Sequence, residues 1–442
     1  MTPSRTATPV PLPEPQVTTL SNGVTLLNAP SASRNVGVFL IVRAGSRDET
    51  AETAGLAHYL EHMFFKGTER RPTARQINRE VDRLGAATNA YTDTEEVGYF
   101  AEGPATALHQ LADIITDMLS RPLFAAEEVE RERNVVLQEL SARLADPDGW
   151  IFDRLGTVAF GGDQPMSWSA AGLPRVIEKA TRDQLLGYHR SFYAPVSMCL
   201  VVAGGATLDP EKADRLLRDV PTAKPRPREP ARWGQGDRYT GNVRPVTESE
   251  EPQTKMAVAL PGIPALDEER TALSLMSFIL GGGMSSRLFH TVRERRGLAY
   301  AIFSFHEAFE DTGVFVISTG TRPRDAVKAV RLSFRELRRM AAQPVPAAEL
   351  AAAKSAMIGR LLRSTETAIA SARFFGGRWR ARLPLETPDQ RADAIARVTA
   401  AEVQRVAERI AAGIDQVRVA FVGPEDQGEA LLEAATDRRA AA

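Results

Sequence analysis

Two distant stretches of the chain can be laid over each other without a gap. Setting Glu128 on Glu349 aligns residues 125–140 with residues 346–361, and the two stretches share an alanine-containing start and the same apolar spacing. We interpret this match as an internal duplication of roughly 200 residues. The 442-residue chain is also too long for one ordinary domain. The sequence therefore predicts two similar halves.

The order of the predicted elements repeats as the duplication requires. In the first half we expect strands, then helices, and then strands and helices again, closed by a buried strand: strands within 17–30 and 35–46, helices around 58 and over 73–85, strands within 87–103, helices over 107–121, 125–147 and 181–192, and a strand over 197–205. The second half follows the same order: a strand over 253–262, helices over 268–282 and 286–297, two strands within 299–320, further helices, and a last strand over 416–424.

Composition sets the predicted domain limits. Residues 221–236 are dense in proline, glycine and charge, which predicts an exposed linker between domains at 17–220 and 237–442. Residues 1–16 are rich in proline and threonine without the apolar stretch of a secretory signal, so we expect a disordered lead-in.

Charge and hydropathy exclude several classes of partner. The formal net charge is −1, so neither a basic field for nucleic acid nor a polybasic segment for anionic lipid is present. No run of roughly 18 apolar residues predicts a membrane span, and the cytoplasm is the expected location. The single cysteine, Cys199, lies in an apolar run that predicts a buried strand. A metal site would therefore need histidine and carboxylate ligands.

The segment "HYLEH" provides the first part of such a site. His58 and His62 are four residues apart and share one face of a helix, so both imidazoles can bind one ion while Glu61 projects beside them. Zinc enzymes use three protein ligands and leave one position open, so a third ligand must come from elsewhere. Glu61 could then accept a proton from water.

A second helix offers candidates for the third ligand. Glu132 and Glu139 lie seven residues apart on one face of the helix predicted over 125–147. The overlay sets them against Ala353 and Arg360, so the carboxylates exist in one half only. The other histidines have no such neighbours, and we expect structural roles for His109, His189, His290 and His306.

With "HYLEHMFFKGT" and "ERNVVLQEL", the chain resembles the M16 metallopeptidases, which carry the inverted zincin motif His-x-x-Glu-His. The resemblance implies that His58, His62 and Glu139 bind one Zn²⁺ per chain, because the family's third ligand is a glutamate seventy-odd residues after the second histidine. It implies that Glu61 is the catalytic base. Glu132 matches the family's acidic residue that orients the site without touching the metal.

The same resemblance implies a fold. We expect an α+β protein of two homologous domains, each a mostly antiparallel sheet with helices packed on one face, as in the LuxS/MPP-like metallohydrolase fold. Only the first domain would hold the metal. The length is similar to that of the short-chain branch, such as the β subunit of mitochondrial processing peptidase, in which two chains form the clam-shell.

Residues 85–100 resemble the family's edge strand, to which a peptide substrate adds as a further strand. The resemblance implies that Asn89 and Ala90 contact the substrate backbone and that Phe65 and Tyr91 line the pocket beside the scissile bond. The alternative is that Phe65 and Tyr91 are ordinary core aromatics.

Residues 281–300 resemble the family's glycine-rich loop and the helix after it. Arg293 and Tyr300 match a pair that would hold the substrate carbonyl and stabilise the oxyanion from the domain facing the zinc. Since this chain carries both the zinc motif and this pair, a homodimer would suffice, although a heterodimer is possible.

The predicted function is a zinc endopeptidase that cleaves peptides or presequences in a closed dimeric chamber. One alternative is a processing peptidase dedicated to a single leader peptide. An alternative of another class is a non-catalytic peptide-binding or scaffold subunit, which would be free of metal.

Overall fold

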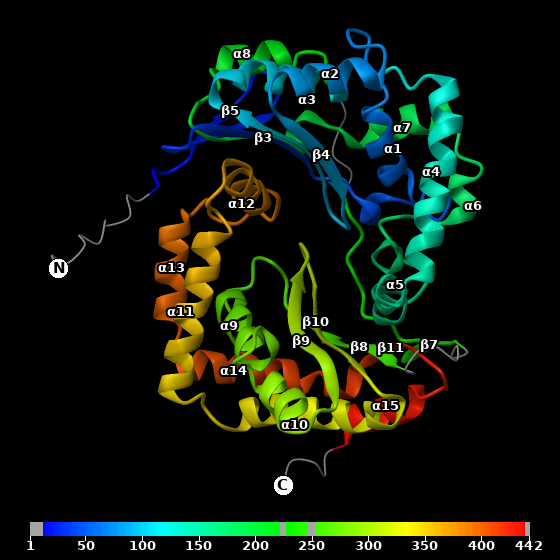
Figure 1. Ribbon diagram of the computed structural model, residues 1–442, viewed down its shortest axis with the longest axis vertical. Helices are drawn as coiled ribbons and strands as arrows, with labels where there is room; N and C mark the ends of the chain where they lie inside the picture. Colours follow the sequence, from blue (N-terminus) through cyan, green and yellow to red (C-terminus); the bar gives the residue numbers. More distant parts are fainter. Residues whose placement is uncertain (1–11, 222–226, 245–252, 438–442) are drawn as a thin grey trace, which may run out of the picture.

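The computed structural model describes residues 12–221, 227–244 and 253–437, and these form two sheet-plus-helix halves stacked with their sheets facing each other (Figure 1). Residues 1–11 of the predicted lead-in and residues 222–226 of the predicted linker lie outside the described residues. The first strand already begins at Gln16.

The first sheet has six strands in the order β1-β2-β6-β3-β5-β4. Their bounds are β1 (Gln16–Thr19), β2 (Thr25–Pro30), β3 (Asn35–Val42), β4 (Ala87–Thr92), β5 (Val97–Pro104) and β6 (Met198–Gly204). Every neighbouring pair is antiparallel except β2 and β6. The central strand β3 is buried from Val36 to Val42, as expected for an apolar, β-branched run covered on both faces. Strand β4 lies at the edge.

The second sheet repeats this topology with the order β7-β11-β8-β10-β9. Its strands are β7 (Tyr239–Val243), β8 (Thr254–Pro261), β9 (Ala299–Ala308), β10 (Gly313–Thr321) and β11 (Arg418–Gly423). Only β7 and β11 pair in parallel. Without β1, the two sheets have the same order and the same strand directions, which is what an internal duplication produces.

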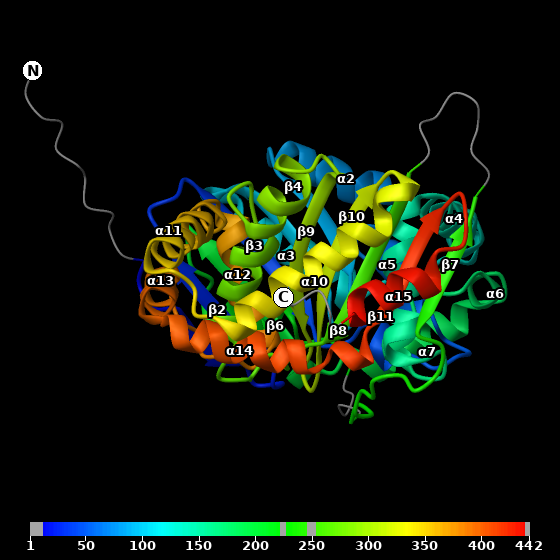
Figure 2. The ribbon, with the colours of Figure 1, turned by 90° about the horizontal axis from the view of Figure 1, so that it is seen from below.

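Helices of each half cover the outer face of its own sheet. The first half contains α1 (Leu56–Phe64), α2 (Ala74–Arg83), α3 (Leu108–Ser120), α4 (Ala126–Ala145), α5 (Pro147–Phe160), α6 (Pro174–Ile177), α7 (Arg182–Phe192) and α8 (Pro210–Leu216). The second half contains α9 (Arg270–Gly281), α10 (Ala326–Ala342), α11 (Ala347–Arg363), α12 (Ala368–Arg380), α13 (Pro388–Arg397), α14 (Ala400–Ala412) and α15 (Gly428–Thr436). Figure 2, seen from below, shows α10, α14 and α15 in front of the second sheet.

The inner face of each sheet is covered by a helix from the other half. Helix α12 packs on β3 and β6 of the first sheet, and α5 packs on β8 and β11 of the second. The α12 contact is close: a Cβ on Gly376 would lie 2.6 Å from the Phe39 ring. The overlay that sets Glu128 on Glu349 also aligns α5 with α12. Each half therefore places the equivalent helix on the sheet of the other half, an arrangement called the reciprocal exchange below.

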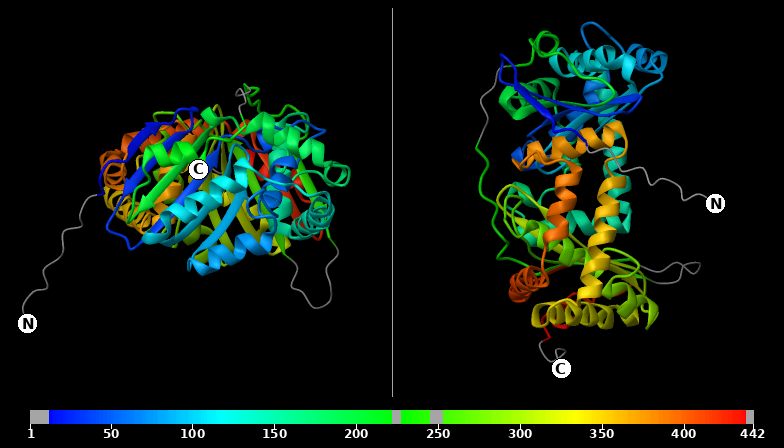
Figure 3. Two further views of the ribbon diagram at one scale, coloured as in Figure 1. Left: turned by 90° about the horizontal axis from the view of Figure 1, so that it is seen from above. Right: turned by 90° about the vertical axis from the view of Figure 1, so that its left-hand side faces the viewer.

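The predicted fold class is thus confirmed, and the exchange adds to it. Helices of the same half do pack on one face of each sheet, but the other face is not open. Helices α11 and α13 run between the two layers and connect α12 to the second half (Figure 3). Apolar side chains of α5 and α12 therefore hold the halves together, in clusters that contain Leu155 and Phe375.

Candidate metal centre

Helix α1 begins at a buried carboxylate. Glu49 is buried and accepts hydrogen bonds from the backbone N–H groups of Gly55, at 2.8 Å, and Ala57, at 2.7 Å. Burial raises the pKa of Glu49 to about 8. Gly55 has a φ of 106°, and a Cβ there would meet the backbone of Gly172 at 2.7 Å, so glycine is required. These contacts fix where the helix starts and how its histidine face is turned.

The structure brings His58 and His62 of α1 together with Glu139 of α4. The Nε2 atoms of the two histidines are 3.2 Å apart. Glu139 Oε2 lies 3.6 Å from His58 Nε2 and 3.4 Å from His62 Nε2. Tetrahedral ligands about 2.0–2.1 Å from a zinc ion would lie roughly 3.3 Å from one another. The three atoms therefore fit one ion, and this is the single such group found among the described residues.

The protonation of His58 suits a metal ligand. Burial, followed by repulsion from His62, lowers the pKa of His58 to about 4. The imidazole is therefore neutral near pH 7, and its Nε2 lone pair can bind a cation.

Glu132 holds His62 from the side away from the cluster. Its buried carboxylate lies 2.9 Å from His62 Nδ1 through one oxygen and 2.6 Å from Lys66 Nζ through the other. A proton on Nδ1 that is donated to a carboxylate leaves Nε2 free to bind metal. Glu132 thus contacts His62 on the side opposite to Glu139, and its orienting role stays a prediction.

Glu61 lies beside the cluster and is held by the edge strand. Its Oε2 accepts a hydrogen bond of 2.6 Å from the hydroxyl of Thr92, the last residue of β4. Burial raises the pKa of Glu61 above its ordinary value. Sequence reasoning missed Thr92, although strand alternation places it on the same face as Ala90, toward α1.

The predicted substrate segment forms β4, an edge strand that includes Asn89 and Ala90. Phe65 and Tyr91, however, lie on opposite faces of the first sheet. Phe65 packs on the core beneath α1, whereas Tyr91 packs on the α12 side, stacks on Phe39 and donates a hydrogen bond of 2.5 Å to Glu96. The structure therefore does not bring them into one pocket. Successive strand residues point to opposite faces, so Tyr91 points away from the α1 side, which Ala90 faces.

Arg293 and Tyr300 lie together in the second half. The guanidinium carbon of Arg293 is 5.4 Å from the centre of the Tyr300 ring, and Tyr300 is 82% exposed at the start of β9. Residues Phe289–Glu294 form a π-helical turn within the region predicted to be a helix. Among the described residues, neither side chain contacts the His58–His62–Glu139 group.

The remaining histidines lie in structural surroundings. His189 is buried against the rings of Phe64, Phe124 and Tyr193, and His306 lies against the backbone of Ile263. His290 pairs with Glu294 and His109 lies beside Lys212. Arg360, at the position equivalent to Glu139, donates to the carbonyl of Gly282 at 3.0 Å. The second half thus keeps the fold without the ligands.

Comparison with known proteins agrees with this division. Residues 24–167 match the family described as insulinase (peptidase family M16), and residues 179–357 match the peptidase M16 inactive domain. The chain belongs to peptidase family M16. An uncharacterized zinc protease of Rickettsia felis is 30% identical over 418 residues, covering 93% of this chain and 98% of its own. An uncharacterized zinc protease of Bacillus subtilis, YmxG, is 30% identical over 363 residues, covering 79% and 84%.

Solved structures share the fold of this M16 chain. A protease from Helicobacter pylori has a TM-score of 0.83 at 21% identity and covers 93% of this chain and 100% of its own. A peptidase M16 inactive domain from Pseudomonas fluorescens has the same TM-score and identity, covering 93% and 98%. Within the described ranges, none of the helices has the length and apolar character needed to cross a membrane.

Proposed function

We propose that this M16 chain is a zinc-dependent endopeptidase with one Zn²⁺ bound by His58, His62 and Glu139. The observation that carries the proposal is the convergence of these three side chains beside a partly buried glutamate, Glu61. The names of the relatives, which are zinc proteases, support the choice of metal.

The chain's own residues divide the chemistry. When bound, the zinc ion would polarise the substrate carbonyl and make an attacking water more acidic. Glu61 would accept the proton from that water and pass it to the leaving nitrogen. Thr92 holds Glu61 at the end of β4, so the base and the edge of the sheet keep a fixed relation.

The proposed substrate is a peptide in extended conformation. Strand β4 is at the edge of its sheet, and a peptide that pairs with it near Asn89 and Ala90 would pass the end of the strand where Thr92 and Glu61 lie. Main-chain pairing requires an unfolded segment. Short unstructured peptides should therefore be cleaved, whereas a folded protein should be spared.

We further propose a homodimer in which each site is completed by the partner chain. Arg293 and Tyr300 contact each other but not the metal-binding group of their own chain, and the Tyr300 side chain is exposed. Presented by a second copy, the pair would stabilise the negative charge that develops on the substrate carbonyl oxygen. A different M16 subunit as the partner is the alternative.

Matched variants test the metal and the base separately. Glu61→Gln should keep the zinc content near one per chain while peptide hydrolysis falls by a factor of at least about 10². Glu139→Gln should lower the zinc content, and Arg360→Ala at the equivalent position of the second half is the control. A wild-type rate in Glu61→Gln, or full zinc in Glu139→Gln, would contradict the assignment. A metal-free wild-type protein would favour a scaffold, and cleavage of a single leader peptide would favour a dedicated processing enzyme.

Subunit mixing tests the dimer. A Glu61→Gln chain and an Arg293→Ala, Tyr300→Phe chain should each be nearly inactive alone. In a randomly exchanged mixture about half the dimers are mixed, each with one complete site of two, so activity should return to roughly a quarter of the wild type. If labelled subunits exchange and no activity returns, the pair does not act across the interface.

A further inference from the structure

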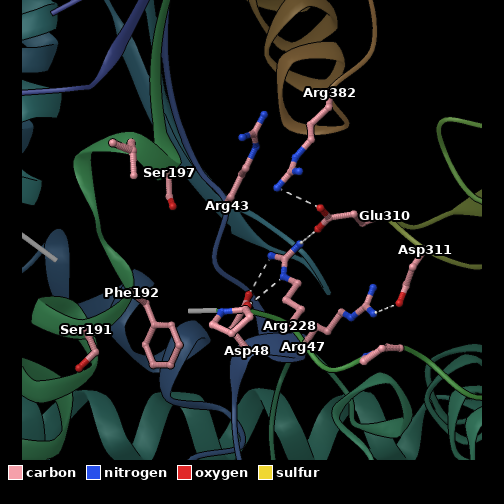
Figure 4. Close-up of a pocket in the computed structure, with 13 residues that line it drawn as sticks. Arg43, Arg47, Asp48, Ser191, Phe192, Ser197, Arg228, Glu310, Asp311 and Arg382 are labelled. Atoms are coloured by element: carbon pink, nitrogen blue, oxygen red, sulfur yellow. Dashed lines mark hydrogen bonds and ion pairs between the residues drawn. The ribbon is translucent and has the colours of Figure 1, made fainter. Parts of the chain in front are cut away.

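A pocket of about 530 Å³ lies where the two halves and the linker meet (Figure 4). Its wall includes Arg43 at the end of β3, Arg228 of the linker and Arg382 after α12. Phe192 at the end of α7 forms part of the opposite side, together with nearby proline and valine side chains. This volume is within the range of pockets that bind small molecules.

The carboxylates that line the pocket are already paired with arginines. Asp48 lies 2.9 Å from Arg228, and Asp311 lies 2.7 Å from Arg47. Glu310 is shared, at 3.3 Å from Arg228 and 3.0 Å from Arg382. Each of these carboxylates thus lies at ion-pair distance from an arginine other than Arg43.

Arg43 is held in another way. Its Nε donates to the carbonyl of Arg380 at 3.1 Å, a second nitrogen donates to the carbonyl of Trp379, and the guanidinium stacks 4.0 Å from the Trp379 ring. Among the described residues it makes no ion pair with a carboxylate, unlike the other arginines of the pocket. Burial and the neighbouring Arg382 lower its pKa to about 10, so it is still charged at neutral pH.

We propose that this pocket binds a small organic oxyanion, a carboxylate or a phosphate monoester, with its charged group between Arg43 and Arg382. A guanidinium fixed by backbone carbonyls and an aromatic ring is preorganised for such a group. The apolar wall around Phe192 suits a short carbon body. The site shares no residue with the His58–His62–Glu139 group and does not depend on the proposed peptidase activity.

Binding there would join three parts of the chain. Arg43 belongs to the first half, Arg382 to the second and Arg228 to the linker, so one ligand contacts all three. Because the ligand binds the assembled pocket and not its separated parts, it raises the melting temperature by mass action.

The test uses sodium benzoate and sodium phosphate as probes, with sodium chloride at equal ionic strength as the reference. Calorimetric titration of the full chain should give saturable binding with a dissociation constant of about 1 mM or lower. Saturation by benzoate identifies a carboxylate ligand, and saturation by phosphate alone identifies a phosphate monoester.

Variants locate the binding. Arg382→Ala, whose side chain is 59% exposed, should fold normally and weaken binding by about tenfold. Arg43→Gln should abolish it. Arg322→Ala, which removes an exposed arginine paired with Asp325 elsewhere, should leave it unchanged. The absence of saturable binding by either probe, or equal binding in the wild type and Arg382→Ala, would overturn the proposal.

Discussion

Replacing Glu95 by glutamine should weaken both the junction of the halves and the catalytic site. The Glu95 side chain is 2% exposed and lies 2.5 Å from Arg47 and 3.0 Å from Arg380. Both of its oxygens accept the backbone N–H of Glu310 at 3.1 Å. It thus connects the turn after β4 to the segment between β3 and α1, to α12 and to the β9–β10 turn. Thr92, which holds Glu61, lies three residues before it.

The expected loss follows from the partners that remain. Removing one member of a buried ion pair costs about 3–5 kcal/mol. Glutamine keeps the shape, Arg47 retains Asp311 and Arg380 retains Glu96, so we expect about 2–3 kcal/mol. At roughly 2–4 °C for each kcal/mol in an unfolding unit of about 200 residues, the size of one half, the melting temperature of that half should fall by about 4–12 °C. The peptidase kcat/KM should fall as well, because the turn that positions Thr92 loses its anchor.

Scanning calorimetry and peptide hydrolysis measure the two effects on one preparation. Glu211→Gln is the matched control, because its side chain is 86% exposed, 3.9 Å from Arg215, and should change stability by less than about 0.5 kcal/mol. An unchanged melting temperature in Glu95→Gln would refute the buried-network reasoning. A lower melting temperature with an unchanged kcat/KM would refute the connection from Glu95 to Glu61.

Three further outcomes are expected. Glu132→Gln should weaken zinc binding by about 10–100-fold in a competitive chelator titration, because His62 loses the carboxylate at its Nδ1. Glu307 is accessible to solvent, but desolvation by the protein around it, followed by repulsion from Asp93, raises its pKa to about 7. Ionisation of Glu307 therefore destabilises the fold progressively as pH rises from about 4.5 to 7. Glu307→Gln should therefore raise the melting temperature more at pH 8 than at pH 5, and an equal effect at both would contradict the shift. Phe375→Ala should lower the free energy of unfolding, measured with denaturant, by about 3–5 kcal/mol, because α12 would lose a large buried side chain that packs against the first sheet. Phe303→Ala, at a partly exposed side chain, should lower it by less than about 1 kcal/mol.

Local spacing predicted the parts of the site that depend on one helix. His58 and His62 share a face because they are four residues apart. The duplication marked both Glu132 and Glu139 as carboxylates without a counterpart, and only the resemblance to the M16 family chose Glu139 as the ligand. The Thr92–Glu61 hydrogen bond joins the end of a strand to a helix, and no local sequence pattern indicates that these two residues meet. Strand alternation would have predicted that Tyr91 points to the face of the sheet opposite to that of Ala90 and Thr92, and therefore away from α1 and Phe65.

The exchange of α5 and α12 could not be predicted from the pattern of either helix. An amphipathic face shows that a helix packs on something apolar, but not which of two equivalent sheets it covers. The two sheets have similar apolar inner faces because they arose by duplication. The choice is made by the direction in which α4 and α11 lead the chain, and that is a property of the tertiary structure.

The reciprocal exchange also has a consequence for the association of the two halves. If the linker were cut, each half would still hold a helix that the other half's sheet requires, so the two pieces should remain associated and should refold best together. This is the arrangement of a domain-swapped dimer of half-length chains. Joining two such chains in one polypeptide makes the pairing independent of concentration, and it would leave one copy free to differ at the positions of the candidate metal ligands.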